Sequence, residues 1–199
     1  MFTQKDSKMK TTALRLAGLT FLLIFGTSCQ ILKPTLISEN DVDNSDKLLS
    51  SIKIEGPSNA VEYINKFKKI SIAEMKRTGV PASIKLAQGI LESGYGSSEL
   101  AKKANNHFGM KCGSQWTGKT YNLKSNCYRA YKSAEEGYRE HSEFLKRKHY
   151  EALFKLKKTD YKGWAKGLQK AGYATDKSYP AKLIELIERY KLYQFDKLG

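Results

Sequence analysis

The chain has 199 residues, of which 40% are hydrophobic and 28% are charged. These values are typical of a soluble globular domain with a core, and they exclude a chain that lies mainly within a membrane. Lysine and arginine number 35 against 20 acidic residues, so the net charge is +15. Such a charge either favours an anionic partner (nucleic acid, acidic lipid or an acidic polymer) or reflects only a solvated basic surface.

The N-terminal segment has the pattern of an export signal. A basic start precedes the apolar run LAGLTFLLIFGTS, which is too short to span a bilayer comfortably and ends directly before Cys29. The segment resembles a bacterial lipoprotein signal, although Gly26 stands where that signal usually has leucine. The resemblance implies that residues 1–28 are removed, that Cys29 is lipidated, and that the lipid holds the protein on the outer membrane facing the periplasm. An ordinary secretory signal and a membrane anchor are the alternatives.

Two further cysteines remain if Cys29 carries lipid, namely Cys112 and Cys127. Export permits a disulfide between them, and a loop of this length would gain about 3 kcal/mol from closure. Two unpaired buried thiols are the alternative. Together with His107 these cysteines match no zinc-binding spacing, so we expect neither a metal nor a cofactor.

The domain organisation follows from a change in pattern near residue 57. Residues 29–56 are polar and lack sustained periodicity, so they are predicted to be a flexible tether. Gly56 and Pro57 then begin a helical pattern that ends at Gly79, with a break expected near residues 70–71. We therefore predict one domain over residues 57–199.

The next helix opens at Pro81 and carries a glutamate near its end. Ile84, Ala87 and Leu91 share an apolar face. The opposite, polar side is expected to contain Lys85, Gln88, Gly89 and Glu92. A short helix over about residues 98–103 follows.

Residues 111–131 change character, because glycine, serine, threonine, asparagine and aromatic residues predominate there. This composition predicts a small antiparallel hairpin, with the two cysteines near its ends. Helices resume at the capping box of Ser133 and Glu136, after Asp160, and at Pro180. The predicted fold class is therefore mostly α, strictly α+β, with one small β insertion.

Glu92 could act as an acid if its surroundings keep it protonated. Breaking a glycosidic bond requires a neutral acid that protonates the departing oxygen. An apolar neighbourhood and the C-terminal end of a helix both raise the pKa of a carboxyl group. Small neighbours such as Gly89, Ser93 and Gly96 would let another part of the chain approach closely. The alternative is an ordinary surface glutamate.

Four ordered motifs resemble the endo-β-N-acetylglucosaminidases of glycoside hydrolase family 73, which include flagellar and autolysin-type peptidoglycan hydrolases. They are AQGILESGYG over residues 87–96, NHFGMK over residues 106–111 with Asn105 before it, the β-lobe to residue 131, and GYATDKSY over residues 172–179. The resemblance covers about residues 60–195. It implies a lysozyme-like fold, in which a helical body and a small β-hairpin lobe face each other across a cleft.

The resemblance also implies roles for single residues. Glu92 matches the family's general acid, and Tyr173 lies in the late motif whose tyrosines are near the reacting sugar. Substrate contacts are expected from Gln88, Phe108, Tyr179 and Trp164. Phe108 and Trp164 could stack on sugar faces, although a place in the core is the alternative for Trp164. Asn105 and Asn106 are expected to anchor the turn after the short helix, or to bind acetamido groups.

The sequence departs from the family in one respect, because no aspartate or glutamate lies between Met110 and Ala134, where many relatives have a second carboxylate. Hydrolysis would then use the substrate's own 2-acetamido group or a water held by Tyr173. A lytic transglycosylase with Glu92 as its sole acid and base, and a scaffold that binds peptidoglycan with little turnover, are the alternative functions. The expected partner is the glycan strand of peptidoglycan, for a monomeric, membrane-anchored protein. Export excludes nucleic acid.

Overall fold

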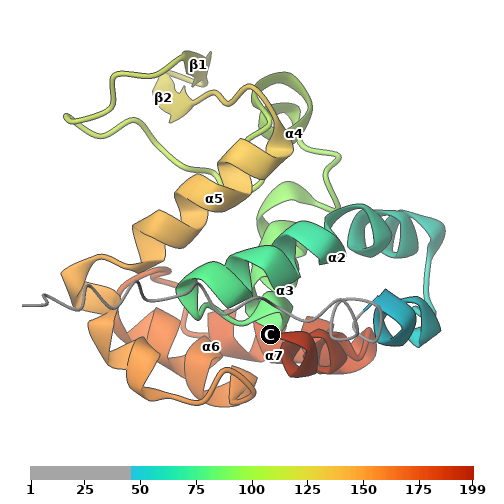
Figure 1. Cartoon of the computed structure of the whole chain (residues 1–199). Coiled ribbons are helices and arrows are strands. Elements are labelled where there is room, and N and C mark those ends of the chain that lie inside the picture. The colour runs from blue at the N-terminus through green and yellow to red at the C-terminus, as the bar shows by residue number, and fades with distance from the viewer. Residues whose placement is uncertain (1–45) are drawn as a thin grey trace, which may run out of the picture. The chain divides into compact units, whose positions relative to one another are not determined.

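The computed structural model describes residues 46–199, and Figure 1 shows their arrangement. The expected signal segment, Cys29 and most of the expected tether lie outside the described residues. No helix within residues 46–199 is long and apolar enough to cross a membrane.

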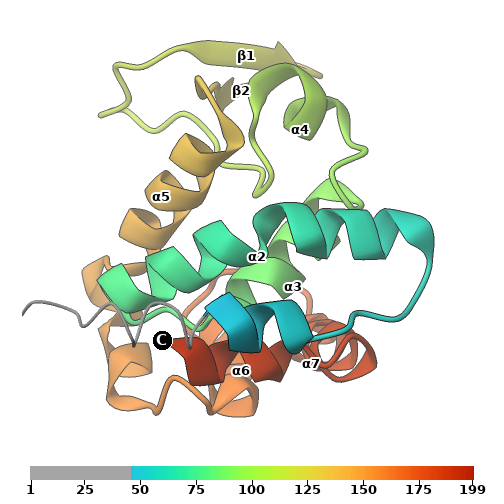
Figure 2. The same ribbon diagram turned by 45° about the vertical axis from the view of Figure 1, so that its right-hand side comes forward.

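The described part is mostly helical, with one two-stranded antiparallel sheet, as the sequence predicts. Helix α5 runs from the sheet, drawn at the top of Figures 1 and 2, to the helices of the body below. The elements are α2 (Ser58–Thr78), α3 (Ala82–Ser93), α4 (Glu99–Ala104), β1 (Thr120–Leu123), β2 (Asn126–Arg129), α5 (Ala134–Leu145), η1 (Lys148–Lys155), α6 (Tyr161–Lys170), α7 (Tyr179–Arg189) and η2 (Leu192–Leu198).

Helix α2 is continuous, so the break expected near residues 70–71 is wrong. The hydroxyl group of Ser71 donates a hydrogen bond to the carbonyl oxygen of Phe67 at 2.9 Å, one turn earlier, and is thereby satisfied within the helix. Tertiary packing then outweighs the weak helix propensity of this stretch, because Phe67, Ile72 and Met75 are all buried in the core. The helix ends at Gly79, whose φ of 86° is left-handed.

The folded body begins before residue 57. Residues 46–51 are helical, and Leu49 belongs to the core cluster. Gly56 lies so close to Tyr190 that an added Cβ would be 2.8 Å from its ring. Residues 46–56 therefore pack against the body, although their polar composition predicts a tether. The apolar residues Leu49, Ile52 and Ile54 make this contact, although the segment as a whole has a polar composition.

Helix α3 lies at the centre of the body, against α2, α6, α7 and η2. Most of its predicted polar side is also buried, because Lys85 and Gln88 have no exposed surface and Gly89 is buried, whereas Glu92 is exposed. Gly89 permits this packing, since a Cβ there would lie 2.5 Å from the hydroxyl oxygen of Tyr63 and 2.8 Å from that of Tyr138. Of the four residues expected on this side, only Glu92 in the last turn reaches the surface.

The C-terminal segment holds the start of α3. Asp196 of η2 is buried and accepts hydrogen bonds from the backbone N–H of Ser83 at 2.8 Å and from its hydroxyl group at 2.6 Å. These bonds satisfy a donor in the first turn of α3 that no helical carbonyl can reach. The C-terminal segment is thus joined to the helix that carries Glu92.

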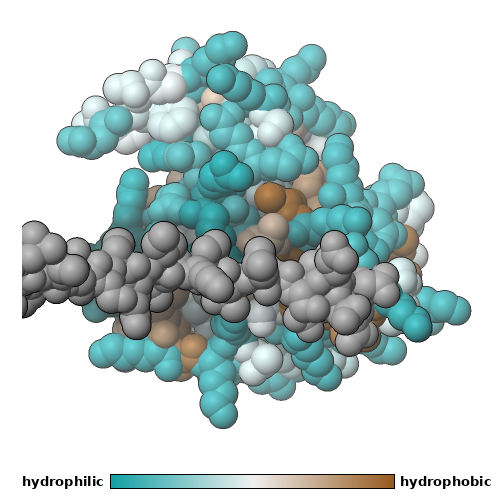
Figure 3. All heavy atoms as spheres, viewed as in Figure 1, coloured by the Kyte–Doolittle hydropathy of each residue, from teal (hydrophilic) through white to brown (hydrophobic). Residues whose placement is uncertain are grey.

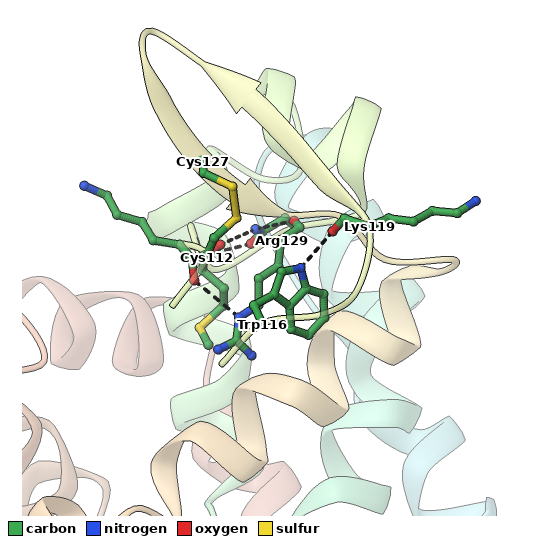
Figure 4. The surroundings of a disulfide bond; sticks show 8 residues. Cys112, Trp116, Lys119, Cys127 and Arg129 are labelled. Atoms are coloured by element: carbon green, nitrogen blue, oxygen red, sulfur yellow. Dashed lines mark hydrogen bonds between the residues drawn. A yellow bond between two sulfur atoms is a disulfide. The ribbon is translucent and has the colours of Figure 1, made fainter. Parts of the chain in front are cut away.

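The β-lobe covers the hairpin and the loop before it, residues 111–131. Strands β1 and β2 pair with Tyr121 opposite Tyr128, and Lys124 and Ser125 make the turn with positive φ angles. A disulfide joins Cys112 to Cys127 (Figure 4). The loop inside it is ordered by Trp116, whose indole N–H donates to the carbonyl oxygen of Lys119 at 3.0 Å.

Two asparagines fix the lobe to the end of α4. The side-chain amide of Asn105 donates to the carbonyl oxygen of Tyr131 at 3.0 Å. The amide of Asn106 donates to the carbonyl oxygens of Met110 and Arg129, both at 2.9 Å, and its oxygen accepts from the N–H of Met110. The structure therefore gives both residues the anchoring role that was one of the two expectations.

Candidate active site

A cleft of about 780 Å³ lies between the β-lobe and the helical body. Hydrophilic side chains cover most of the face drawn in Figure 3, as expected for a protein of this charge. Four segments line the cleft: the end of α3, the loop and strand of the lobe, the junction of α5 with η1, and the late motif. Their main contributors are Leu91, Glu92, Phe108, Met110, Lys111, Arg129, Phe144, Arg147, Tyr150, Tyr173, Asp176, Tyr179 and Lys182.

Glu92 lies in the last turn of α3, which ends at Gly94 in the left-handed conformation. Its side chain opens to the cleft, and the hydroxyl group of Tyr179 donates a hydrogen bond to Oε1 at 3.2 Å. The surrounding groups limit solvation of the carboxyl group and thereby raise the pKa of Glu92, while the bond from Tyr179 offsets part of the rise. The partial negative charge at the end of α3 acts in the same direction as the desolvation.

Gln88 forms a hydrogen bond with the tyrosine of this pair. Its side-chain Nε2 donates to the hydroxyl oxygen of Tyr179 at 3.0 Å, so the hydroxyl hydrogen of Tyr179 is left for Glu92. Gln88 is fully buried and does not line the cleft. The expected direct contact of Gln88 with substrate does not fit this position, because Gln88 reaches the cleft only through its hydrogen bond to Tyr179.

Tyr173 and Phe108 also line the cleft. The hydroxyl group of Tyr173 lies 3.0 Å from Nε2 of His141, on α5. The ring of Phe108 stacks on the imidazole of His141, with ring centroids 3.9 Å apart and planes 8° apart. Phe108 is 5% exposed, so little of its surface is open to the cleft. The ring of Tyr179 lies 5.7 Å from that of Tyr173, which groups the two tyrosines beside Glu92.

Trp164 does not belong to this group. It lies on α6 with 1% of its surface exposed, and its ring packs edge-on against Phe154 at a centroid distance of 5.3 Å. It does not line the cleft. The expected sugar contact of Trp164 is wrong, and the alternative of a core tryptophan is correct, because its face on α6 points into the body.

Asp176 is the second carboxylate of the cleft lining, and it comes from the helical side rather than from the lobe. Its Oδ1 accepts from the backbone N–H of Ser178 at 2.8 Å, and its Oδ2 pairs with Lys182 at 2.8 Å. These hydrogen bonds, that from Lys182 first, lower the pKa of Asp176 to about 2. Both oxygens are therefore engaged, and the group is ionised at any working pH.

Four cations line the same cleft. Arg129 pairs with Glu140 at 2.9 Å and Lys182 with Asp176, while Lys111 donates to the side chain of Asn126. Arg147 lies over the ring of Phe144, 4.5 Å from its centroid. The cleft thus presents more positive than negative groups. Among residues 46–199, no cluster of three or more histidine, cysteine or acidic side chains could hold a metal ion.

The sequence does not predict that Asp176 and His141 belong to this region, and it does not predict the contacts of Lys85. Asp176 lies within the late motif, but its spacing to Lys182 is that of an ordinary surface ion pair and does not suggest a place in the cleft. His141 lies in a polar helix pattern that gives no sign of burial. Asp176 lines the cleft, whereas Lys85 and His141 are buried and meet only because α3 and α5 bring them within 3.2 Å of each other. No local sequence pattern predicts that contact.

Comparison with known proteins agrees with this geometry. The family described as glucosaminidase, mannosyl-glycoprotein endo-beta-N-acetylglucosaminidase, matches residues 68–192. The exo-glucosaminidase LytG of Bacillus subtilis is 36% identical over 134 residues, which are 59% of this chain and 46% of LytG. The peptidoglycan hydrolase FlgJ of Pseudomonas aeruginosa is 28% identical over 69% of this chain and 38% of its own length. The chain thus spans less than half the length of these two relatives.

Solved structures share the fold. The catalytic domain of the autolysin Auto from Listeria monocytogenes superposes with a TM-score of 0.61 at 26% identity, over 82% of this chain and 99% of that domain. The glycoside hydrolase domain of FlgJ from Salmonella typhimurium gives a TM-score of 0.57 at 27% identity, over 66% of this chain and 88% of that domain. The lysozyme-like arrangement of helices and a small sheet that the sequence predicts is therefore confirmed.

Proposed function

Because the chain belongs to the glucosaminidase family described above, we propose that it is a peptidoglycan hydrolase that cleaves the β-1,4 bond after N-acetylglucosamine, with Glu92 as general acid. The observation that carries this proposal is the hydrogen bond from Tyr179 to Glu92 inside the cleft. Glu92 lines that cleft and its pKa is raised, which supports its assignment as the acid.

The bond from Tyr179 has a chemical consequence for the acid. Because the hydroxyl hydrogen of Tyr179 occupies Oε1, the proton of neutral Glu92 belongs on Oε2. Glu92 then donates that proton to the glycosidic oxygen as the carbon–oxygen bond breaks, and the sugar ring takes up positive charge. The carboxylate that remains still accepts the same hydrogen bond, which stabilises its charge.

The nucleophile is proposed to come from the substrate or from water. Asp176 is the other carboxylate of the cleft, but the hydrogen bonds from Lys182 and Ser178 lower its pKa to about 2 and make it a weak base. The substrate's 2-acetamido oxygen would therefore attack the anomeric carbon and form a cyclic intermediate that water opens, or a water beside Tyr173 would attack directly. Phe108 and Tyr179 are proposed to bind substrate at the cleft wall.

The lack of a free second carboxylate also fits a lytic transglycosylase, in which the 6-hydroxyl of a muramic acid attacks and Glu92 serves as both acid and base. The products separate the two reactions. Hydrolysis would leave reducing N-acetylglucosamine ends, whereas transglycosylation would leave 1,6-anhydromuramic ends, and mass spectrometry of digested peptidoglycan distinguishes them. A protein that binds glycan and releases neither product would be a scaffold, and the hydrolase proposal would fail.

The partner and the location are proposed from charge and from the N-terminus. Arg147 and Lys111 of the cleft, together with a net charge of +15, suit the carboxylates of peptidoglycan. We propose that Cys29 carries a lipid that holds a monomeric protein at the envelope. Labelling cells with a fatty acid analogue tests this proposal, because a Cys29→Ala variant should lose both the label and the membrane fraction.

A further inference from the structure

A line of buried polar groups connects the middle of α3 to Tyr173, and the mechanism above does not use it. It begins at Lys85, which lies two turns before Glu92 on α3 and has no exposed surface. It continues through His141 on α5, which is also fully buried, and ends at the hydroxyl group of Tyr173 in the cleft. A buried lysine is costly, so its hydrogen bonds matter.

The surroundings of Lys85 match an ammonium group. Its Nζ lies 2.6 Å from the carbonyl oxygen of Tyr138, 2.8 Å from the hydroxyl oxygen of Ser142 and 3.2 Å from Nδ1 of His141. An ammonium has three hydrogens to donate and accepts none. Each of the three neighbours can accept one, so the charged form of Lys85 is fully satisfied if Nδ1 of His141 bears no hydrogen.

This requirement decides the tautomer of His141. Burial, together with the charge of Lys85, lowers the pKa of His141 well below its usual value, so the ring is neutral and carries one hydrogen. With Nδ1 accepting from Lys85, that hydrogen is on Nε2, 3.0 Å from the hydroxyl oxygen of Tyr173. The stacked ring of Phe108 holds the imidazole in this plane.

The tautomer of His141 fixes the direction of its hydrogen bond with Tyr173. The oxygen of Tyr173 accepts from His141, so that bond does not use the hydroxyl hydrogen of Tyr173, and Tyr173 lines the cleft beside Tyr179. Burial and the neighbouring Tyr179 and Glu92 raise the pKa of Tyr173 well above its usual value, so the phenol keeps its hydrogen. Tyr173 can then donate a hydrogen bond to the substrate but cannot act as a base.

We propose that Lys85 and His141 are positioning residues that make Tyr173 a hydrogen-bond donor toward the cleft. The proposal rests on the proposed function, since it assigns the donor a target there: an acceptor oxygen of the substrate, such as the acetamido carbonyl, or the oxygen of the attacking water. Donation to a carbonyl oxygen fixes the acetamido group, and donation to water leaves the second lone pair of that water for the attack.

The line reverses when Lys85 loses its proton. A neutral amine has a lone pair, so Nζ can accept from Nδ1–H of His141, and Nε2 then accepts the hydrogen of Tyr173. Burial lowers the pKa of Lys85 to about 7, with Glu74 opposing and Arg77, also on α2, adding to the shift. The other groups that face Lys85 are His141, Ser142 and the rings of Tyr138 and Phe108. We expect the reversal above about pH 7.

Nuclear magnetic resonance of the purified protein labelled with ¹⁵N-histidine tests the tautomer without any turnover. Two-bond couplings identify which ring nitrogen bears hydrogen, and the His141→Gln variant assigns the signal. We expect His141 with hydrogen on Nε2 at pH 5.5, and with hydrogen moving to Nδ1 as the pH rises past about 7. Hydrogen on Nδ1 at pH 5.5, or an imidazole that becomes charged near pH 6.5, would overturn the proposal.

Kinetics on peptidoglycan test the consequence. Because the reaction needs protonated Glu92, activity should decline as the pH rises and Glu92 loses its one proton. We expect an additional decline in activity above about pH 7, when Lys85 loses its proton. Tyr173→Phe leaves the buried groups in place and should abolish the additional decline, with kcat about 10–100-fold lower and KM little changed. Lys85→Met should do the same, and adding it to Tyr173→Phe should cost nothing more. Lys166→Met, an exposed lysine of α6, is the control.

The two proposals fail in different ways. Wild-type protein that releases no glycan fragments would contradict the proposed function, while the histidine tautomer would still decide the inference about Lys85. If the wild type is active and Tyr173→Phe keeps the additional alkaline decline, or if Lys85→Met and Tyr173→Phe lower kcat independently, the inference about Lys85 is wrong and the hydrolase proposal stands.

Discussion

The hydroxyl group of Tyr179 lies 3.2 Å from Oε1 of Glu92, although the two residues are 87 positions apart. Glu92 ends α3 and Tyr179 begins α7, so packing of these two helices builds the pair. The same hydroxyl group accepts from Gln88, which orients its hydrogen toward Glu92. The acid of the proposed reaction is thus oriented by a residue of the late motif.

Replacing Tyr179 by phenylalanine should change the pH dependence of the reaction. The hydrogen bond from Tyr179 lowers the pKa of Glu92 against the effect of desolvation, so its loss should raise that pKa further. Since the proposed reaction needs protonated Glu92, the alkaline limb of kcat/KM should move to higher pH, and kcat should fall about tenfold with the lost orientation. A limb that moves to lower pH would contradict this account.

Replacing Gln88 by leucine should separate activity from stability. The side-chain oxygen of Gln88 is buried and has no hydrogen-bond partner among the described residues, so the free energy of desolvating this oxygen is not compensated. An apolar side chain removes that cost together with the bond to Tyr179, and the free energy of unfolding should change by less than about 1 kcal/mol. Activity should fall as in Tyr179→Phe. Urea denaturation and initial rates measure the two effects, and a loss of stability with unchanged kcat would contradict the positioning role.

Removing the disulfide should loosen the lobe without unfolding the body. Cys112 and Cys127 are 15 residues apart, and closing such a loop is worth about 3 kcal/mol in the chain-entropy model. A Cys112→Ser/Cys127→Ser variant should therefore unfold at lower denaturant concentration. The KM for peptidoglycan should rise, because Met110, Lys111 and Arg129 of the lobe segment line the cleft. The far-ultraviolet circular dichroism spectrum should remain that of a helical protein. An unchanged unfolding midpoint would show that the disulfide contributes nothing to the stability of the protein.

Asp196 should make stability depend on pH. Burial raises the pKa of Asp196 from 3.8 to about 6, although Ser83 donates two hydrogen bonds to the carboxyl group. Between these pH values the folded protein holds a proton that the unfolded chain has released, so the free energy of unfolding should fall as the pH rises through this window. Asp196→Asn should flatten that slope, whereas Asp196→Ala should cost about 1–3 kcal/mol at all pH values. An unchanged slope in Asp196→Asn would exclude this origin.

Local signals in the sequence predict much of the fold. Ser133 and Asp160 each accept a hydrogen bond from the backbone of the first turn that follows, as their capping patterns predict. The hairpin also appears where the composition changes. These features succeed because each depends on interactions within a few residues, which a short pattern contains.

Features that depend on tertiary packing are not predicted. Lys85 and Gln88 look solvent-exposed by periodicity, but α5 and α7 cover them and convert a polar helix face into a buried hydrogen-bond network. Trp164 looks available for a sugar, but α6 turns it into the core. Within the candidate site, resemblance to a family predicts roles for Glu92, Tyr173 and Tyr179, whereas the residues that contact them are found only from the folded structure.

The most direct test of the central claim compares the wild type with Glu92→Gln on purified peptidoglycan, with the released ends identified by mass spectrometry. Glu185→Gln is the control, because that glutamate lies on the exposed side of α7 in a surface pair with Arg189. We expect reducing N-acetylglucosamine ends from the wild type and the control, and none from Glu92→Gln, which keeps a neutral side chain of equal size but has no proton to give. Undiminished release of these ends by a folded Glu92→Gln variant would contradict the assignment of Glu92 as the acid.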